Sequence, residues 1–164
     1  MHALKLAVES HDAQAVIALL APNIIIRSPI TTLIRFEGID QTGDLFRRVF
    51  SVVSGIRFYE TVGNDGKTQV IFWRGRVGKH YLEEANLLRL NAQGRIAEMT
   101  MFMRAVPGLL ALATELASSL ASRQGRLRSY IVRFMLGFIG VLYRTHESLV
   151  IALAGAGVAA EPEK

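Results

Sequence analysis

In residues 80–90 every second side chain from His80 onwards falls on one face of an extended chain, and three side chains on this otherwise apolar face are polar, namely His80, Glu84 and Asn86. A carboxylate among apolar side chains has a raised pKa, which is how a general acid or base that works near neutral pH is made. The carboxamide of Asn86 can donate a hydrogen bond and so polarise a carbonyl or hydroxyl group. These residues predict proton transfer on a small molecule, with Glu84 as the proton carrier, Asn86 as the polarising group and His80 as a further catalytic candidate.

Two of these residues also have a purely structural interpretation. Glu84 would equally fit the mouth of a pocket or an ion pair with an arginine, because buried carboxylates are rare unless they are paired. His80 lies next to an expected turn, where side chains are usually exposed to solvent. The sequence alone leaves both interpretations open for each residue.

The elements that must position these residues follow from a change of periodicity near Gly55. After this point apolar and polar residues alternate with a period of two, which is typical of strands, and turn signals occur at 64–66, 77–78 and 91–94. Consecutive strands joined by tight turns form an antiparallel meander. The expected strands cover residues 56–62, 69–76, 79–90 and 95–103.

One face of this meander is expected to line a pocket. A two-residue turn at 77–78 pairs Ile71 with Glu84, and residues that lie opposite one another share a face. The face with Glu84 is mostly apolar, as pocket linings are, although Trp73 and the methionines also fit simple core packing. With Ser28 at the rim, the predicted ligand-binding residues are Ser28, Ile71, Trp73, Leu82, Leu88, Met99, Met101 and Met103.

Helical periodicity flanks the meander on both sides. Apolar residues recur at helical spacing before Pro22, and a strand over 23–27, an extended piece over 34–37 and a helix over 39–53 follow. After Pro107 two further apolar stripes are expected to pack against the rest of the protein. Their members are Leu109, Leu112, Leu116 and Leu120 in the first stripe, and Ile131, Phe134, Phe138 and Leu142 in the second.

Composition limits the classes of function. The 164 residues carry a net charge of +5, contain no cysteine, and have four widely spaced histidines, so we expect neither a metal site nor a cofactor. The basic excess gathers in Arg123, Arg126, Arg128 and Arg133 without a nucleic-acid motif, so we expect no nucleic acid partner. No segment resembles a signal peptide or a membrane span. We expect a cytoplasmic protein, for which a membrane surface is a less favoured partner.

Four segments carry a resemblance to a known family. They read H-D-A-Q-A-V-I-A-L-L-A-P-N at 11–23, I-I-I-R-S-P at 24–29, F-E-G-I-D at 36–40 and L-L-R-L-N-A-Q-G-R-I at 87–96. These segments, together with the order of the expected helices and strands, resemble the nuclear transport factor 2-like superfamily, in its SnoaL-like and ketosteroid-isomerase-like branch. The resemblance implies an α+β fold, in which a cone-shaped, curved and mostly antiparallel sheet wraps around the N-terminal helices and leaves an apolar pocket.

The resemblance also divides the chain and implies a partner. It covers residues 1–104, which leaves 105–154 as a helical extension packed on the core or on a dimer, and 155–164 as a disordered tail. Members of the superfamily commonly form homodimers through the sheet. The outer face of the meander, with Phe72, Arg74, Tyr81 and Arg89, is the expected contact.

The ketosteroid isomerases of this branch use a tyrosine, a protonated aspartic acid and an aspartate base. The matching positions here hold Leu4, Asn86 and Ser28, of which only Asn86 keeps a hydrogen-bond donor. The resemblance therefore implies a small-molecule pocket protein rather than a steroid isomerase of that mechanism. Two functions stay open: an isomerase-, cyclase- or hydrolase-like enzyme acting on a small apolar substrate, and a non-catalytic ligand-binding or dimerisation module.

Overall fold

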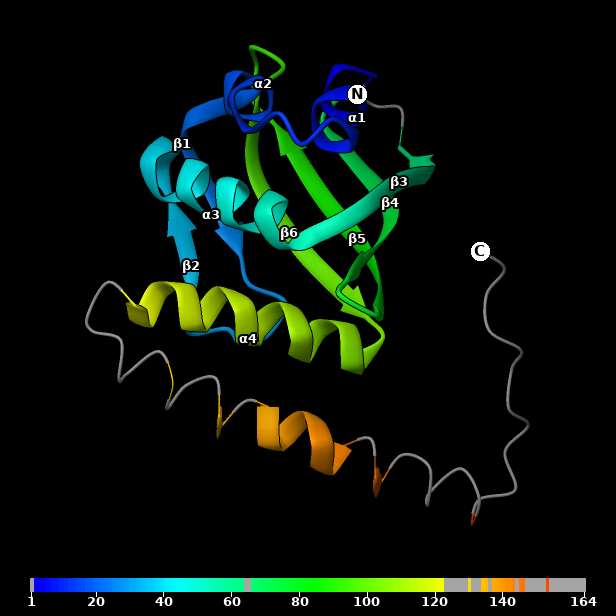
Figure 1. Cartoon of the computed structure of the whole chain (residues 1–164). Helices are drawn as coiled ribbons and strands as arrows, with labels where there is room; N and C mark the ends of the chain where they lie inside the picture. Colours follow the sequence, from blue (N-terminus) through cyan, green and yellow to red (C-terminus); the bar gives the residue numbers. More distant parts are fainter. Residues whose placement is uncertain are drawn as a thin grey trace.

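The structure is a computed structural model that describes residues 2–63, 66–122, 130, 134–135, 137–143, 145–146 and 153. It contains one curved six-stranded sheet with the strand order β2-β1-β6-β5-β4-β3 (Figure 1). The neighbouring strands are antiparallel except for β1 and β6, which are parallel. The strands are β1 (Leu20–Arg27), β2 (Arg35–Glu37), β3 (Val53–Val62), β4 (Thr68–Val77), β5 (His80–Leu90) and β6 (Ile96–Arg104).

Helices cover the concave face of this sheet and complete the predicted α+β architecture. They are α1 (His2–Glu9), α2 (Ala13–Ala18), α3 (Gly38–Val52) and α4 (Val106–Ser122). Asp12 caps α2, since its side chain accepts a hydrogen bond from the Ala15 amide at 2.9 Å. Buried side chains of α1 and α3, such as Leu4 and Val49, pack with strand residues such as Ile26 in a single hydrophobic core.

The turn between β4 and β5 differs from the expected one. Val77 pairs with His80, so the two central residues are Gly78 and Lys79 rather than Val77 and Gly78. Gly78 has a φ of +56°, a conformation that tight hairpin turns require and that a β-branched valine avoids. The pairing between these strands is therefore shifted by two residues, and Glu84 lies opposite Trp73 instead of Ile71.

The pairing of β5 with β6 is shifted in the same way. An irregularity between Arg89 and Leu90 places Asn86 opposite Met101, whereas the expected turn would place it opposite Met99. Side chains alternate between the faces of a strand, so a shift of two residues exchanges partners but keeps each residue on its face. The predicted grouping of Glu84 and Asn86 with the methionines of β6 on one face therefore agrees with the structure.

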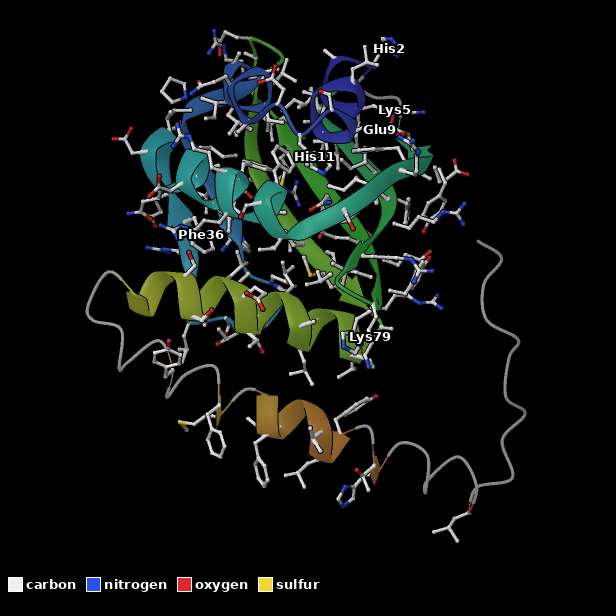
Figure 2. The ribbon with its side chains drawn as sticks, in the orientation of Figure 1. His2, Lys5, Glu9, His11, Phe36 and Lys79 are labelled. Carbon is white, nitrogen blue, oxygen red and sulfur yellow. The ribbon has the colours of Figure 1, made fainter. Side chains whose placement is uncertain are left out.

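The first predicted stripe of the C-terminal part belongs to α4, which packs against the sheet. Leu112 is buried in the core, and Gly108 lies so close to β5 that an added Cβ would be 2.1 Å from the carbonyl oxygen of Tyr81. A guanidinium nitrogen of Arg48 on α3 also donates a hydrogen bond to Ser119. Lys79, at the tip of the β4–β5 hairpin, lies beside the first turns of α4 (Figure 2).

The second predicted stripe behaves differently. Its members Phe134, Phe138 and Leu142 are exposed in the single chain, so they do not contribute to its core, and packing of this stripe on a dimer stays a prediction. Ile131, the four arginines of the basic cluster and the tail 155–164 lie outside the described residues. In the described part of the chain, no helix is both long and apolar enough to cross a membrane.

Candidate active site

A cavity of about 40 Å³ lies between the concave face of the sheet and helices α1 and α3. Its wall is almost entirely apolar, with Leu4 from α1, Phe50 from α3 and Trp73 from β4 among the lining residues. The polar groups in the lining are the side chains of Glu84 and Asn86, two positions apart on β5. Side chains alternate between the two faces along β5, so residues two positions apart lie on the same face.

The carboxyl group of Glu84 is almost completely excluded from solvent. Its side chain lies in the core with only 2% of the residue exposed, and one carboxyl oxygen, Oε2, has no hydrogen-bond partner. Burial raises the pKa of Glu84 to about 8, because the charged form loses its hydration, while a hydrogen bond from Asn86 acts in the opposite direction. Near neutral pH both protonation states are accessible, as proton transfer requires.

Asn86 is buried to the same degree, with 3% exposed. Its hydrogen bond lowers the pKa of Glu84, so it favours the charged carboxylate, and the Asn86 amide nitrogen is the donor. The amide oxygen of Asn86, Oδ1, is buried without a partner, as is Oε2 of Glu84. Since buried polar atoms are normally paired, two unpaired acceptors at the wall of one cavity mark a place for a donor group of a ligand or a water molecule.

The other predicted ligand-binding residues divide into three groups. Ile71, Trp73, Met99 and Met101 line the cavity beside the polar pair. Leu82 and Leu88 lie on the same face and are fully buried in the core, but neither of them lines the cavity. Met103 lies opposite Glu84 and borders a shallow depression with Tyr59 and Phe102.

His80 and Ser28 are not brought to the cavity. His80 begins β5 and borders a separate groove with Lys79 and Pro107 of α4. It precedes Glu84 by four residues, which is about 13 Å along an extended strand. The Ser28 hydroxyl accepts a hydrogen bond from the amide of Ile30 at 3.2 Å, which places it in a turn.

Several lining residues come from the helices, and they were not identified from the sequence as part of the site. They include Val8, Leu45 and Phe46, which belong to apolar stripes that the sequence shows. A stripe predicts that a helix has a buried face, but which of its residues border an empty space depends on how the helix lies on the sheet.

Two polar contacts hold α1 and the following turn in place above the cavity. A carboxyl oxygen of Glu9 accepts a hydrogen bond from the Phe58 amide at 2.9 Å, which ties the end of α1 to β3. The Nε2 atom of His11 lies 3.1 Å from the carbonyl oxygen of Val53, and its ring makes a T-shaped contact with the ring of Phe50. Because Phe50 and Phe58 both line the cavity, these contacts fix part of its wall.

A group of three or more histidine, cysteine, aspartate or glutamate side chains arranged to hold a metal ion is absent from the part of the chain that the structure describes.

Comparison with known proteins relates the chain to one family and one fold. A family model described as a SnoaL-like domain matches residues 2–99. No curated protein matches the chain. Among solved structures, a steroid delta-isomerase from Pseudomonas aeruginosa is 25% identical, with 72% of this chain and 86% of that chain covered and a TM-score of 0.65.

Two further solved structures share the fold at lower identity. An uncharacterised protein with a cystatin-like fold from Silicibacter pomeroyi is 21% identical, with coverages of 80% of this chain and 92% of that chain and a TM-score of 0.70. SalBIII, an epoxide hydrolase/cyclase-like enzyme of pyran ring formation in the polyether salinomycin, is 18% identical, with coverages of 60% and 83% and a TM-score of 0.52.

Proposed function

The chain belongs to the SnoaL-like domain family, and from this membership and the buried pair of polar residues we propose that it is an enzyme that isomerises a small, mostly apolar ketone by moving one proton. The observation that carries the proposal is Glu84, buried in an apolar cavity with a pKa near 8 and a hydrogen bond from Asn86. The similarity to a steroid delta-isomerase, at 25% identity, supports the same class of reaction.

Isomerisation is the reaction class that a single proton carrier can complete. Among the described residues that line the cavity, Glu84 is the one that titrates near neutral pH. Hydrolyses and dehydrations commonly use two groups, one that activates the nucleophile or carbon acid and one that protonates the leaving group. An isomerisation removes a proton from one carbon and returns it to another, so the same carboxylate can do both.

The two side chains take different parts in this reaction. The carboxylate of Glu84 accepts the proton from the carbon next to the carbonyl and then delivers it to the distant carbon. The Asn86 amide has two N–H groups, of which one serves Glu84 and the other is available to the carbonyl oxygen, where negative charge develops. With a pKa near 8, roughly a tenth of the Glu84 side chains are ionised at pH 7.

The size of the cavity argues for a small substrate. Ligand pockets for drug-sized molecules usually measure about 300–1,000 Å³. The cavity here is about 40 Å³, which is too small for a steroid unless side chains of its wall move. An apolar cavity that holds a six-membered ring such as benzene measures about 150 Å³, so a ring of five or six carbon atoms bearing one ketone is the closer match and also requires side chains of the wall to move.

The test uses a β,γ-unsaturated cyclohexenone, whose conversion to the conjugated enone is followed by ultraviolet absorbance. We expect turnover by the native protein, with kcat/KM rising with pH and levelling above about pH 8. Glu84→Gln should lose this activity, whereas the control Glu98→Gln, which alters an exposed carboxylate paired with Arg89, should keep it. Equal rates for Glu84→Gln and the native protein, or no turnover of small β,γ-unsaturated ketones, would contradict the proposal.

A non-catalytic ligand-binding module is the second candidate. The observation that favours it is that Leu4 and Ser28 occupy the positions where related ketosteroid isomerases carry a donor and a base. In that case the saturated ketone cyclohexanone should bind and perturb the nuclear magnetic resonance signals of Asn86, yet the unsaturated ketone should bind without being converted.

We further propose that the protein is a homodimer that associates through the convex face of the sheet. This face carries the neighbouring rings of Tyr59 and Phe72 and an exposed Phe102. Glu83 contributes charge there, since it accepts a hydrogen bond from the Tyr59 hydroxyl at 2.7 Å and pairs with Arg104 at 3.1 Å. Aromatic side chains mixed with a few charged groups are typical of protein–protein contacts.

A further inference from the structure

A short helical segment follows α4 along the chain, and it shows an unusual distribution of small and large residues. Its described residues are 134–135, 137–143 and 145–146, and it lies on the side of α4 that faces away from the sheet (Figure 1). Gly137 and Gly140 border a groove of about 490 Å³ together with Leu110 and Ala111 of α4. Gly140 is buried and therefore faces the protein, whereas Gly137 borders the groove from an exposed position.

The large apolar residues of this segment point the other way. Six of them are between 43% and 75% exposed: Phe134, Met135, Phe138, Ile139, Val141 and Leu142. At about 100° per residue they cover one continuous face about 160° wide. We call these six residues the apolar face. A continuous face of this kind is rare on the surface of a protein that has no partner there.

The sequence around the apolar face carries charge of one sign. Between Leu116 and His146 there are five arginines, at positions 123, 126, 128, 133 and 144, and there is no aspartate or glutamate. In a contact between the apolar faces of two copies, the surrounding sequences would carry net charge of the same sign, which disfavours a second copy as the occupant. An anionic lipid surface offers the opposite charge together with an apolar layer.

We propose that the apolar face docks on the surface of a membrane that contains anionic lipid. The helical segment lies in the plane of the interface, with its apolar face at the boundary between headgroups and acyl chains, and the positive charge of the surrounding sequence attracts the anionic headgroups. The segment is far shorter than the roughly 20 residues that a membrane span requires, so the proposal is one of surface attachment. It is independent of the reaction proposed for Glu84.

The test is co-sedimentation of the full chain with vesicles. One set contains equal parts of phosphatidylserine and phosphatidylcholine, and the other contains phosphatidylcholine alone. We expect binding to the phosphatidylserine vesicles that weakens as salt rises, and at least about tenfold weaker binding to phosphatidylcholine. The double variant Phe134→Glu/Phe138→Glu should bind phosphatidylserine vesicles at least about tenfold more weakly, because it adds charge at the centre of the apolar face.

A matched control separates this effect from a general change in surface charge. Leu6 on α1 is about as exposed as Phe138 but lies outside the helical segment, so Leu6→Glu should bind like the native protein. A second variant, with glutamine in place of the five arginines, should lose the preference for phosphatidylserine. Equal binding by the double variant and the native protein would overturn the proposal. The proposal would also be overturned if the native protein did not sediment with the phosphatidylserine vesicles and the double variant differed from it only in oligomeric state.

Discussion

The amide nitrogen of Asn86 donates a hydrogen bond to the carboxyl group of Glu84, two positions away on the same strand. The pair is enclosed by apolar side chains, and each residue keeps one buried oxygen atom unpaired. The hydrogen bond favours the ionised carboxylate and burial favours the neutral acid, with burial the larger effect. This balance determines how the protein should respond to pH and to substitution of either residue.

The first prediction concerns stability as a function of pH. Glu84 ionises near 4.5 in the unfolded chain and near 8 in the folded protein, so between these values the folded state holds a proton that the unfolded state has lost. The stability that this proton contributes is complete below about pH 4.5 and is lost as pH rises to about 8. Relative to Glu84→Gln, the native protein should lose up to about 5 kcal/mol of unfolding free energy across this range.

Urea unfolding of both proteins at intervals between pH 4 and pH 9 measures this difference. Glu98→Gln serves as the control, because its carboxylate is on the surface and its removal should leave the pH dependence as in the native protein. A constant stability difference between Glu84→Gln and the native protein would rule out a raised pKa.

The second prediction concerns the partner in the pair. Asn86→Leu removes the hydrogen bond that favours the charged form while keeping a similar side-chain volume, so the pKa of Glu84 should rise above 8. A titration followed by carboxyl carbon resonances measures it. Met101→Leu alters the lining without removing a donor and should leave the Glu84 titration in place. An unchanged or lower pKa in Asn86→Leu would show that the amide does not favour the carboxylate.

The third prediction tests the docking of α4. Gly108→Ala would place a methyl group 2.1 Å from the Tyr81 carbonyl oxygen, a backbone atom that cannot move without disturbing β5. We expect a loss of about 3 kcal/mol in unfolding free energy, measured by thermal or urea unfolding. Gly137→Ala has open space around the new methyl group and should be neutral or slightly stabilising. Similar stabilities for both variants would mean that α4 does not contact β5 so closely.

The fourth prediction follows from the proposed homodimer. Phe102→Glu puts a negative charge near Glu83 on the convex face of the sheet and should convert the dimer to a monomer, as measured by light scattering at tens of micromolar protein. Leu33→Glu changes a fully exposed residue between β1 and β2 and should leave the dimer intact. A monomeric native protein at this concentration would contradict the proposed contact.

The faces of the strands could be predicted from the sequence, although the exact pairing could not. Alternation along β5 places Glu84 and Asn86 on one face whichever turn residues are chosen, and the expected residues of β4 and β6 share this face because the errors in the pairing are two residues each. The partners of Glu84 depend on which residues form the turn. A β-branched residue such as Val77 is unsuited to the first central position of a tight hairpin turn, and this favours Gly78 there.

The candidate site was predicted in part, and the difference follows from distances that periodicity does not contain. His80 shares a face with Glu84, but the length of the strand between them puts it beside α4 and the hairpin tip. Phe46 and Phe50 reach the cavity because α3 crosses the sheet at a particular place, which no local pattern encodes. The exposed position of Phe138 also depends on long-range packing, since its apolar stripe alone indicates burial.

The most direct test of the account is a titration of Glu84 in the ligand-free protein, followed by the carbon resonance of its carboxyl group and assigned with Glu84→Gln. Glu84 should ionise with a pKa of about 8, because the carboxyl group is buried among apolar side chains with one hydrogen-bond donor. A pKa near 4.5 would mean that the carboxylate is solvated or paired with a cation, and it would contradict both the buried geometry and the proposed proton transfer.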